Sequence, residues 1–107
     1  MSEDLACSTI AELSRRLESH ECSSREITEA CLDRITRIDP GIRAFLSLRP
    51  EDALAQADVA DRQRKNGAAP KLCGIPLGIK DNICISDERT TCASKILENF
   101  RPPYTAT

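Results

Sequence analysis

An apolar run, residues 72–85, constrains the fold of this chain more than any other feature of the sequence. The run has no helical period and contains Gly74 and Gly78, so it predicts a strand that is buried on both faces and packed closely at its glycines. Such a strand needs neighbours, because amide and carbonyl groups without partners are costly away from water. The only other candidate strand is the short apolar segment 44–48. We therefore expect an incomplete part of a larger sheet protein.

Two capping boxes predict where the first two helices begin. In Thr9–Glu12 and again in Ser23–Glu26, a hydroxyl can accept a hydrogen bond from the amide three residues later while the glutamate reaches back. Apolar residues follow each box at helical spacing. They are Ile10, Leu13 and Leu17 in the first helix and Ile27, Cys31, Ile35 and Ile38 in the second. The Asp-Pro-Gly segment 39–41 predicts the end of the second helix, because a residue before proline avoids the helical region.

A third helix is predicted to begin at Pro50 and to stop at Asn66–Gly67. Proline suits the first turn of a helix, and Glu51 and Asp52 suit its positive end. Its apolar side is mostly alanine, and the chain contains only 3% aromatic residues. Rings usually supply much of a core's buried area, so a core here must come from Leu, Ile, Ala and Cys. Narrow stripes of this kind predict helices that pack on a larger body.

The charge and the apolar pattern argue against several classes of function. A formal net charge of −2 gives the chain no long-range attraction for nucleic acid or anionic lipid. No stretch approaches the roughly 20 apolar residues that cross a bilayer, and the acidic N-terminus does not resemble a signal peptide. We therefore expect a cytoplasmic protein without a membrane partner.

The six cysteines do not form the pattern of a metal site. None falls in a CxxC pair, and His20 is the only histidine, so neither a metal nor a cofactor is expected on this chain. Without an export signal, a disulfide framework is not expected either. We interpret Cys31, Cys73 and Cys84 as small buried side chains with reduced thiols.

Lys80 is the residue with the most distinctive chemistry, because it stands at the end of the glycine-containing apolar part of this run, residues 72–79. In the plain interpretation, the strand leaves the core there, and Lys80, Asp81 and Asn82 are its first solvated residues. In the functional interpretation, a lysine rooted in an apolar strand loses its water and acts as a proton acceptor. The local pattern by itself favours the plain interpretation.

Two motifs resemble a known family. The segment Gly74–Ile83, GIPLGIKDNI, resembles the lysine motif of the amidase-signature family. The segment Thr90–Phe100, TTCASKILENF, with the Pro-Pro-Tyr of residues 102–104, is similar to the form found in the A subunits of the glutamyl-tRNA(Gln) and aspartyl-tRNA(Asn) amidotransferases. Segments 10–13, 23–26 and 43–46 are also similar to the N-terminal regions of those proteins. The resemblance runs from about Leu5 to Thr107.

This resemblance implies an α/β fold, of which residues 1–107 are the N-terminal part of an amidase domain. Helices in residues 9–66 would form an N-terminal helical layer. Residues 72–100 would supply the first strands of the mixed sheet and the lysine segment. The fold would be incomplete within these residues.

The resemblance also implies a role for Lys80. In the family a lysine of a Ser–cis-Ser–Lys triad takes a proton, through the bridging cis serine, from the nucleophilic serine. That serine attacks a carboxamide, forms an acyl-enzyme and releases ammonia. For the amidotransferases the implied substrate is glutamine, and the implied partners are the B and C subunits. One of these partners, with ATP and magnesium, would use the ammonia to amidate misacylated Glu-tRNA or Asp-tRNA, which this chain meets only through the complex.

The catalytic serines of the family lie in a Gly/Ser-rich region beyond the lysine, and residues 81–107 contain no such region. Ser86 and Ser94 are not substitutes, since neither lies in a glycine-rich turn. We therefore expect these 107 residues to be inactive by themselves. The chain departs from the family pattern at Ser86–Glu88, where a Lys-Gly turn is usual, and at Gly78, where alanine is common.

Two other interpretations remain open. The chain could belong to another amidase that acts on small amides, which the sequence beyond residue 107 would reveal. It could instead be a non-catalytic interaction module, whose helices bind an intact amidase or one of its partner proteins. A monomer that melts cooperatively would favour the module, and an aggregating or molten product would favour part of a larger domain.

Overall fold

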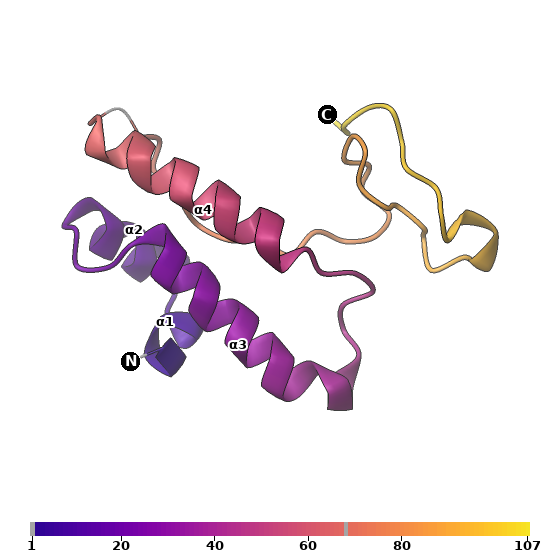
Figure 1. Ribbon diagram of the computed structural model, residues 1–107, viewed down its shortest axis with the longest axis horizontal. Helices are drawn as coiled ribbons and strands as arrows, with labels where there is room; N and C mark the ends of the chain where they lie inside the picture. Colours follow the sequence, from indigo (N-terminus) through magenta and orange to yellow (C-terminus); the bar gives the residue numbers. More distant parts are fainter. Residues whose placement is uncertain (1, 68) are drawn as a thin grey trace. The chain divides into compact units, whose positions relative to one another are not determined.

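The computed structural model describes residues 2–67 and 69–107. The chain divides into two compact units, which we call the helical unit, Met1–Pro76, and the lysine unit, Leu77–Thr107. The described residues form helices α1 Ser2–Cys7, α2 Ile10–Glu18, α3 Ser24–Ile42 and α4 Pro50–Lys65 and the 3-10 turn η1 Lys95–Leu97 (Figure 1). These described residues contain no strand, so they do not form the expected first strands of a mixed sheet.

Helix α3 is central to the helical unit, because both α1 and α4 pack against it (Figure 1). The core consists of Leu5, Leu13, Leu17, Ile27 and Ala30. Leu17 and Ile27 are 1% and 0% exposed, and burial of each contributes about 1.5–3 kcal/mol. Of the predicted stripes, Ile10 and Ile38 are instead 50% and 38% exposed. The core is therefore small and purely aliphatic.

The predicted helix starts are confirmed. The Thr9 hydroxyl accepts a hydrogen bond from the Glu12 amide at 3.2 Å, and the Ser23 hydroxyl accepts one from the Glu26 amide at 3.1 Å. Helix α4 begins at Pro50 as predicted and is capped at its end by Asn66. The Thr9 and Ser23 hydroxyls satisfy amides that a helix end leaves unpaired, and Pro50 has no amide to leave unpaired.

The predicted end of the second helix at residues 39–41 is wrong, because α3 continues to Ile42 with Pro40 inside its last turn. Proline there removes only one helical hydrogen bond, and Asp39 compensates from both its backbone and its side chain. Its carbonyl accepts from the Arg43 amide at 2.6 Å, and its carboxylate accepts from the Ala44 amide at 2.7 Å. Arg43 then ends the helix in the left-handed region, at φ 59°.

A turn at residues 71–74, which we call the anchored turn, joins the helices of the helical unit through its carbonyl groups. The Ser14 hydroxyl donates to the Lys71 carbonyl at 2.9 Å, and the Ser24 hydroxyl donates to the Gly74 carbonyl at 2.8 Å. Arg64 of α4 donates twice to the Cys73 carbonyl, at 3.2 and 2.9 Å. Helices α2, α3 and α4 therefore each hold the same short turn.

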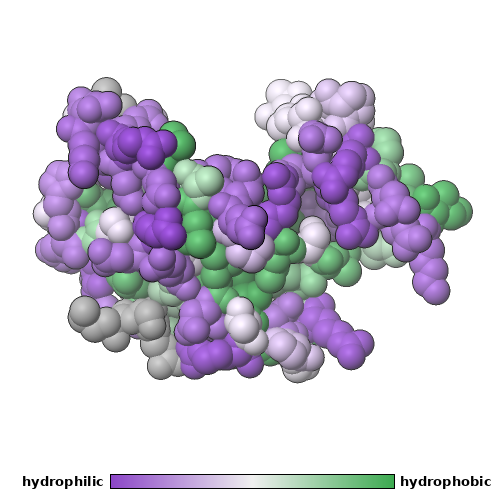
Figure 2. Space-filling model, in the orientation of Figure 1, coloured by the Kyte–Doolittle hydropathy of each residue, from purple (hydrophilic) through white to green (hydrophobic). Residues whose placement is uncertain are grey.

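The strand predicted for residues 72–85 is not formed, and neither is the one predicted for residues 44–48. The described residues offer no neighbouring strand, and the carbonyls of the anchored turn bond to helix side chains instead. The run is also exposed rather than buried: Leu77 is 69% exposed, and Ile79 and Ile83 are each 48% exposed. Apolar surface is accordingly visible among the polar side chains in Figure 2.

The lysine unit is irregular backbone closed by a few hydrogen bonds. The Thr90 amide donates to the Phe100 carbonyl at 3.0 Å, and the Asp87 amide donates to the Pro102 carbonyl at 2.9 Å. Pro102 is buried among these turns. Ser94 precedes η1 but makes no side-chain cap bond.

Substitution of Gly74 by alanine is expected to destabilise the helical unit. Gly74 has φ +91°, and an added Cβ would lie 3.0 Å from Ser24 Cβ and 3.2 Å from Ser24 Oγ. The strained backbone and the displaced serine should cost about 1–3 kcal/mol. Urea unfolding followed by helical circular dichroism measures this loss. Gly41→Ala is the matched control, because its Cβ meets no atom within 4 Å, and equal midpoints for both variants would contradict the prediction.

Candidate functional site

Lys80 lies in the lysine unit, on an exposed stretch that ends in the turn at Asp81 and Asn82. Its carbonyl accepts a hydrogen bond from the Ile83 amide at 3.0 Å. Its ammonium makes no hydrogen bond or ion pair with any residue that the structure describes. The lysine is thus held through its backbone.

Its neighbour Asp81 is the most densely hydrogen-bonded residue of this turn. The Asp81 carboxylate accepts from the Thr91 amide at 3.0 Å, from the Thr91 hydroxyl and from the Ala93 amide at 3.3 Å. The Asp81 carbonyl accepts from the Cys92 amide at 3.1 Å. The hydrogen bond from the Thr91 hydroxyl, followed by the one from the Thr91 amide, lowers the pKa of the Asp81 carboxyl from its ordinary value of 3.8.

The loop that bonds to Asp81 has an unusual backbone. Cys92 and Ala93 both adopt left-handed conformations, with φ 50° and 56°, which residues other than glycine rarely do. Thr90 and Thr91, just before them, are 4% and 7% exposed. We call residues 90–94 the threonine loop. Asp81 connects this loop to the backbone that carries Lys80.

The sequence pattern does not single out Asp81, which it presents only as a solvated residue after the predicted strand. Two sequence features could have pointed to Asp81: its place beside the lysine, and the polar Thr-Thr segment further along the chain. The two serines excluded as nucleophiles, Ser86 and Ser94, both use their backbone amides in the lysine unit. Ser86 is exposed, and its amide donates to the Thr105 hydroxyl at 3.0 Å, whereas Ser94 is half-buried and its amide donates to the Thr91 carbonyl at 2.8 Å.

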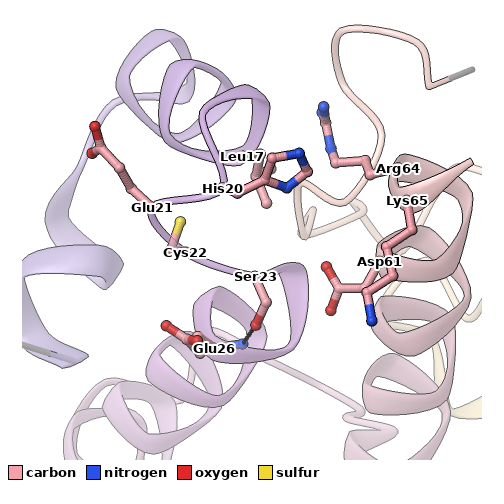
Figure 3. Close-up of a pocket in the computed structure, with 9 residues that line it drawn as sticks. All are labelled: Leu17, His20, Glu21, Cys22, Ser23, Glu26, Asp61, Arg64 and Lys65. Carbon is pink, nitrogen blue, oxygen red and sulfur yellow. Dashed lines mark hydrogen bonds between the residues drawn. The ribbon is translucent and has the colours of Figure 1, made fainter. Parts of the chain in front are cut away.

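A pocket of about 290 Å³ lies in the helical unit, between the start of α3 and the end of α4 (Figure 3). It is lined by Leu17, His20, Glu21, Cys22, Ser23, Glu26, Asp61, Arg64 and Lys65. In Figure 3, Asp61 points from α4 towards the beginning of α3. Its carboxylate accepts from the Ser24 amide at 2.7 Å and from the Arg25 amide at 3.1 Å.

Three polar side chains of this pocket are occupied by the fold itself. Asp61 caps α3, Arg64 holds the anchored turn, and Ser23 caps the same helix as Asp61. Burial, with a contribution from Glu26, raises the pKa of the Cys22 thiol, which disfavours the reactive thiolate. We therefore assign the pocket to the structural joint between α3 and α4.

Cys31, Cys73 and Cys84, which were predicted to be buried, have free thiols and are half-buried. Burial raises the pKa of the Cys31 thiol as well. Among the described residues, no group of three or more His, Cys, Asp or Glu side chains could hold a metal ion. None of the described helices is long and apolar enough to cross a membrane.

Comparison with known proteins identifies the family. The model of the family described as Amidase matches residues 26–107, which include most of α3, α4 and the whole lysine unit. The chain belongs to the amidase family. Lys80, Asp81 and the threonine loop all lie within the matched region of this amidase chain.

Several curated relatives are named as the A subunit of glutamyl-tRNA(Gln) amidotransferase. The amidase chain is 51% identical to the one from Pelobacter propionicus over 104 residues, which is 97% of the chain and 21% of that relative. It is 48% identical to the one from Dehalococcoides mccartyi strain BAV1 over 103 residues, 96% of the chain and 21% of the relative. The relative from Thioalkalivibrio sulfidiphilus is 50% identical over 99 residues, 92% of the chain and 20% of the relative. The chain thus spans about a fifth of the length of these relatives.

The hydrogen bonds at Asp81 should depend on pH only in strongly acidic solution. Because the pKa of Asp81 is lowered from 3.8 on folding, its stabilising contribution is present above 3.8 and is lost as the pH falls through the lower folded value. The amide NMR shifts of Thr91 and Ala93 should therefore stay constant from about pH 7 to about pH 5 and move together below pH 3.8. A midpoint above the ordinary carboxyl value would contradict the geometry.

The structural role of the pocket predicts different effects for two aspartates on α4. Asp61→Ala removes both hydrogen bonds to the start of α3 and should cost about 1–2 kcal/mol of stability. Asp58→Ala removes only an ion pair with Arg25. The Asp58 side chain is 41% exposed and the Arg25 side chain 45% exposed, so the loss of stability should stay below about 1 kcal/mol. Urea unfolding measures both losses. A larger loss for Asp58→Ala would refute the assignment.

Proposed function

We propose that this chain forms the N-terminal part of the glutamine-hydrolysing A subunit of a tRNA-dependent amidotransferase. The observation that carries the proposal is the identity of 48–51% to relatives that bear this name, over 92–97% of the chain. The lysine motif Gly74–Ile83 supports it, because it lies within the region that the amidase model matches.

Lys80 is the proton acceptor in this proposal. It takes the proton of the nucleophilic serine through a bridging cis serine, and the serine oxygen then bonds to the carboxamide carbon of glutamine. The proton returns to the leaving amide nitrogen, ammonia departs, and water hydrolyses the acyl-enzyme to glutamate. The side-chain nitrogen of Lys80 is exposed and has no partner among the described residues, so it is available to pair with the bridging serine.

The proposed fold is an amidase mixed sheet, in which residues 1–107 form the N-terminal part. The helices of residues 9–66 would be its outer layer, and residues 72–100 would supply strands and the lysine segment. The exposed side chains of Leu77, Ile79 and Ile83 support this proposal, because a strand buried on both faces requires apolar residues along its whole length.

The proposed partners are the B and C subunits of the same amidotransferase. The chain would pass ammonia to a partner that uses ATP and magnesium to amidate misacylated Glu-tRNA or Asp-tRNA. No cofactor is assigned to this chain, and the complex is proposed to act in the cytoplasm.

The proposal can be tested in a chimera. Residues 1–107 replace the aligned fifth of the Pelobacter propionicus relative, and the chimera is expressed with that organism's B and C subunits. We expect ammonia release from glutamine and amidation of Glu-tRNA(Gln). Lys80→Met should lower glutamine hydrolysis by a factor of about 10²–10⁴, the range typical of a lost general base.

Lys71→Met is the matched control, because Lys71 is an exposed lysine that contributes only its carbonyl to the fold. It should retain the activity of the unmodified chimera. Full activity of Lys80→Met would refute the role of Lys80. Hydrolysis of small amides without glutamine hydrolysis would favour the alternative amidase. The 107-residue chain alone should release no more ammonia than its own Lys80→Met variant.

A further inference from the structure

We infer that Asp81 is a positioning residue for Lys80, because it fixes the backbone from which the lysine side chain leaves. The inference rests on the proposed function of Lys80 and adds a residue to it. It also gives the threonine loop a role, which the motif by itself does not provide.

The geometry that carries this inference is the convergence of three consecutive residues on one aspartate. The Thr91 amide and hydroxyl and the Ala93 amide donate to the carboxylate, while the Cys92 amide donates to the carbonyl at 3.1 Å. The side chain and the backbone of Asp81 are both held by the same loop. Rotation of Asp81 about either its side-chain or its backbone bonds would break at least one of these contacts.

Fixing Asp81 also restricts Lys80. The two Cα atoms are joined by one planar peptide, about 3.8 Å apart. The Lys80 ammonium has no partner among the described residues, so the backbone is what these residues hold. The direction in which the lysine side chain starts is therefore set by the contacts of its neighbour.

The conformation of the threonine loop supports the same conclusion. Cys92 and Ala93 occupy the left-handed region with φ 50° and 56°, and such conformations persist where surrounding contacts over-determine them. Here the surrounding contacts are those with Asp81. A looser connection between the loop and the turn would not need two unfavourable residues in succession.

Three substitutions in the chimera test the inference. Asp81→Asn replaces an oxygen acceptor by an amide donor facing the loop amides, and Thr91→Val removes the hydroxyl without changing the shape of the side chain. Each should lower kcat for glutamine hydrolysis by about 10–100-fold, as small misplacements of a reacting group do, with KM changed by less than about threefold. Thr91→Ser keeps the hydroxyl and should restore most of the kcat.

Thr105→Val is the matched control, since the Thr105 hydroxyl accepts one bond, from the Ser86 amide, in the same unit. It should leave kcat unchanged. Unchanged kcat in both Asp81→Asn and Thr91→Val, or a loss in Thr91→Val that Thr91→Ser does not restore, would overturn the inference and leave the role of Lys80 intact. Full activity of Lys80→Met would overturn both. If Asp81→Asn fails to fold, the kcat of Thr91→Val still decides between the two outcomes.

Discussion

The carbonyl groups of the anchored turn are the constraint on which the helical unit depends. A turn packed against helices must find donors for its carbonyls, and Ser14, Ser24 and Arg64 supply them from three different helices. The guanidinium makes charge-assisted bonds, which are stronger than neutral ones. These bonds fix helices that share only a small aliphatic core. Hydrogen bonds to one turn thus hold the three helices together, as a larger core would otherwise do.

The same turn explains why α3 and α4 meet where they do. Asp61 caps the start of α3 one turn before Arg64 reaches the Cys73 carbonyl, so a single stretch of α4 serves both neighbours. Ser24 lies at this junction as well, with its amide bonded to Asp61 and its hydroxyl bonded to Gly74. Because the groups are shared, the pocket beside them is a consequence of this joint.

The helix starts were predictable because a capping residue acts within one turn of itself. Thr9, Ser23 and Pro50 each mark a start in the sequence and in the structure. The end of α3 was not predictable, since the effect of Pro40 depends on what Asp39 bonds to afterwards. The apolar composition of residues 72–85 predicted a strand, but the described residues contain no neighbouring strand, and the scarcity of other candidate strands in the sequence already pointed to this lack. A local sequence pattern does not determine whether a segment pairs with residues that are distant in the chain.

The two residues of the candidate site differ in the same way. Lys80 could be singled out because a cationic side chain directly after an apolar segment is visible locally and matches a family motif. Asp81 looked like an ordinary solvated residue, since the role that we infer for it rests on hydrogen bonds from Thr91 and Ala93, which are ten and twelve residues away in sequence. A lysine that transfers protons needs a defined position as much as a suitable environment. In the proposed function, the chemistry at residue 80 therefore depends on the backbone order at residue 81, which the hydrogen bonds from the threonine loop support.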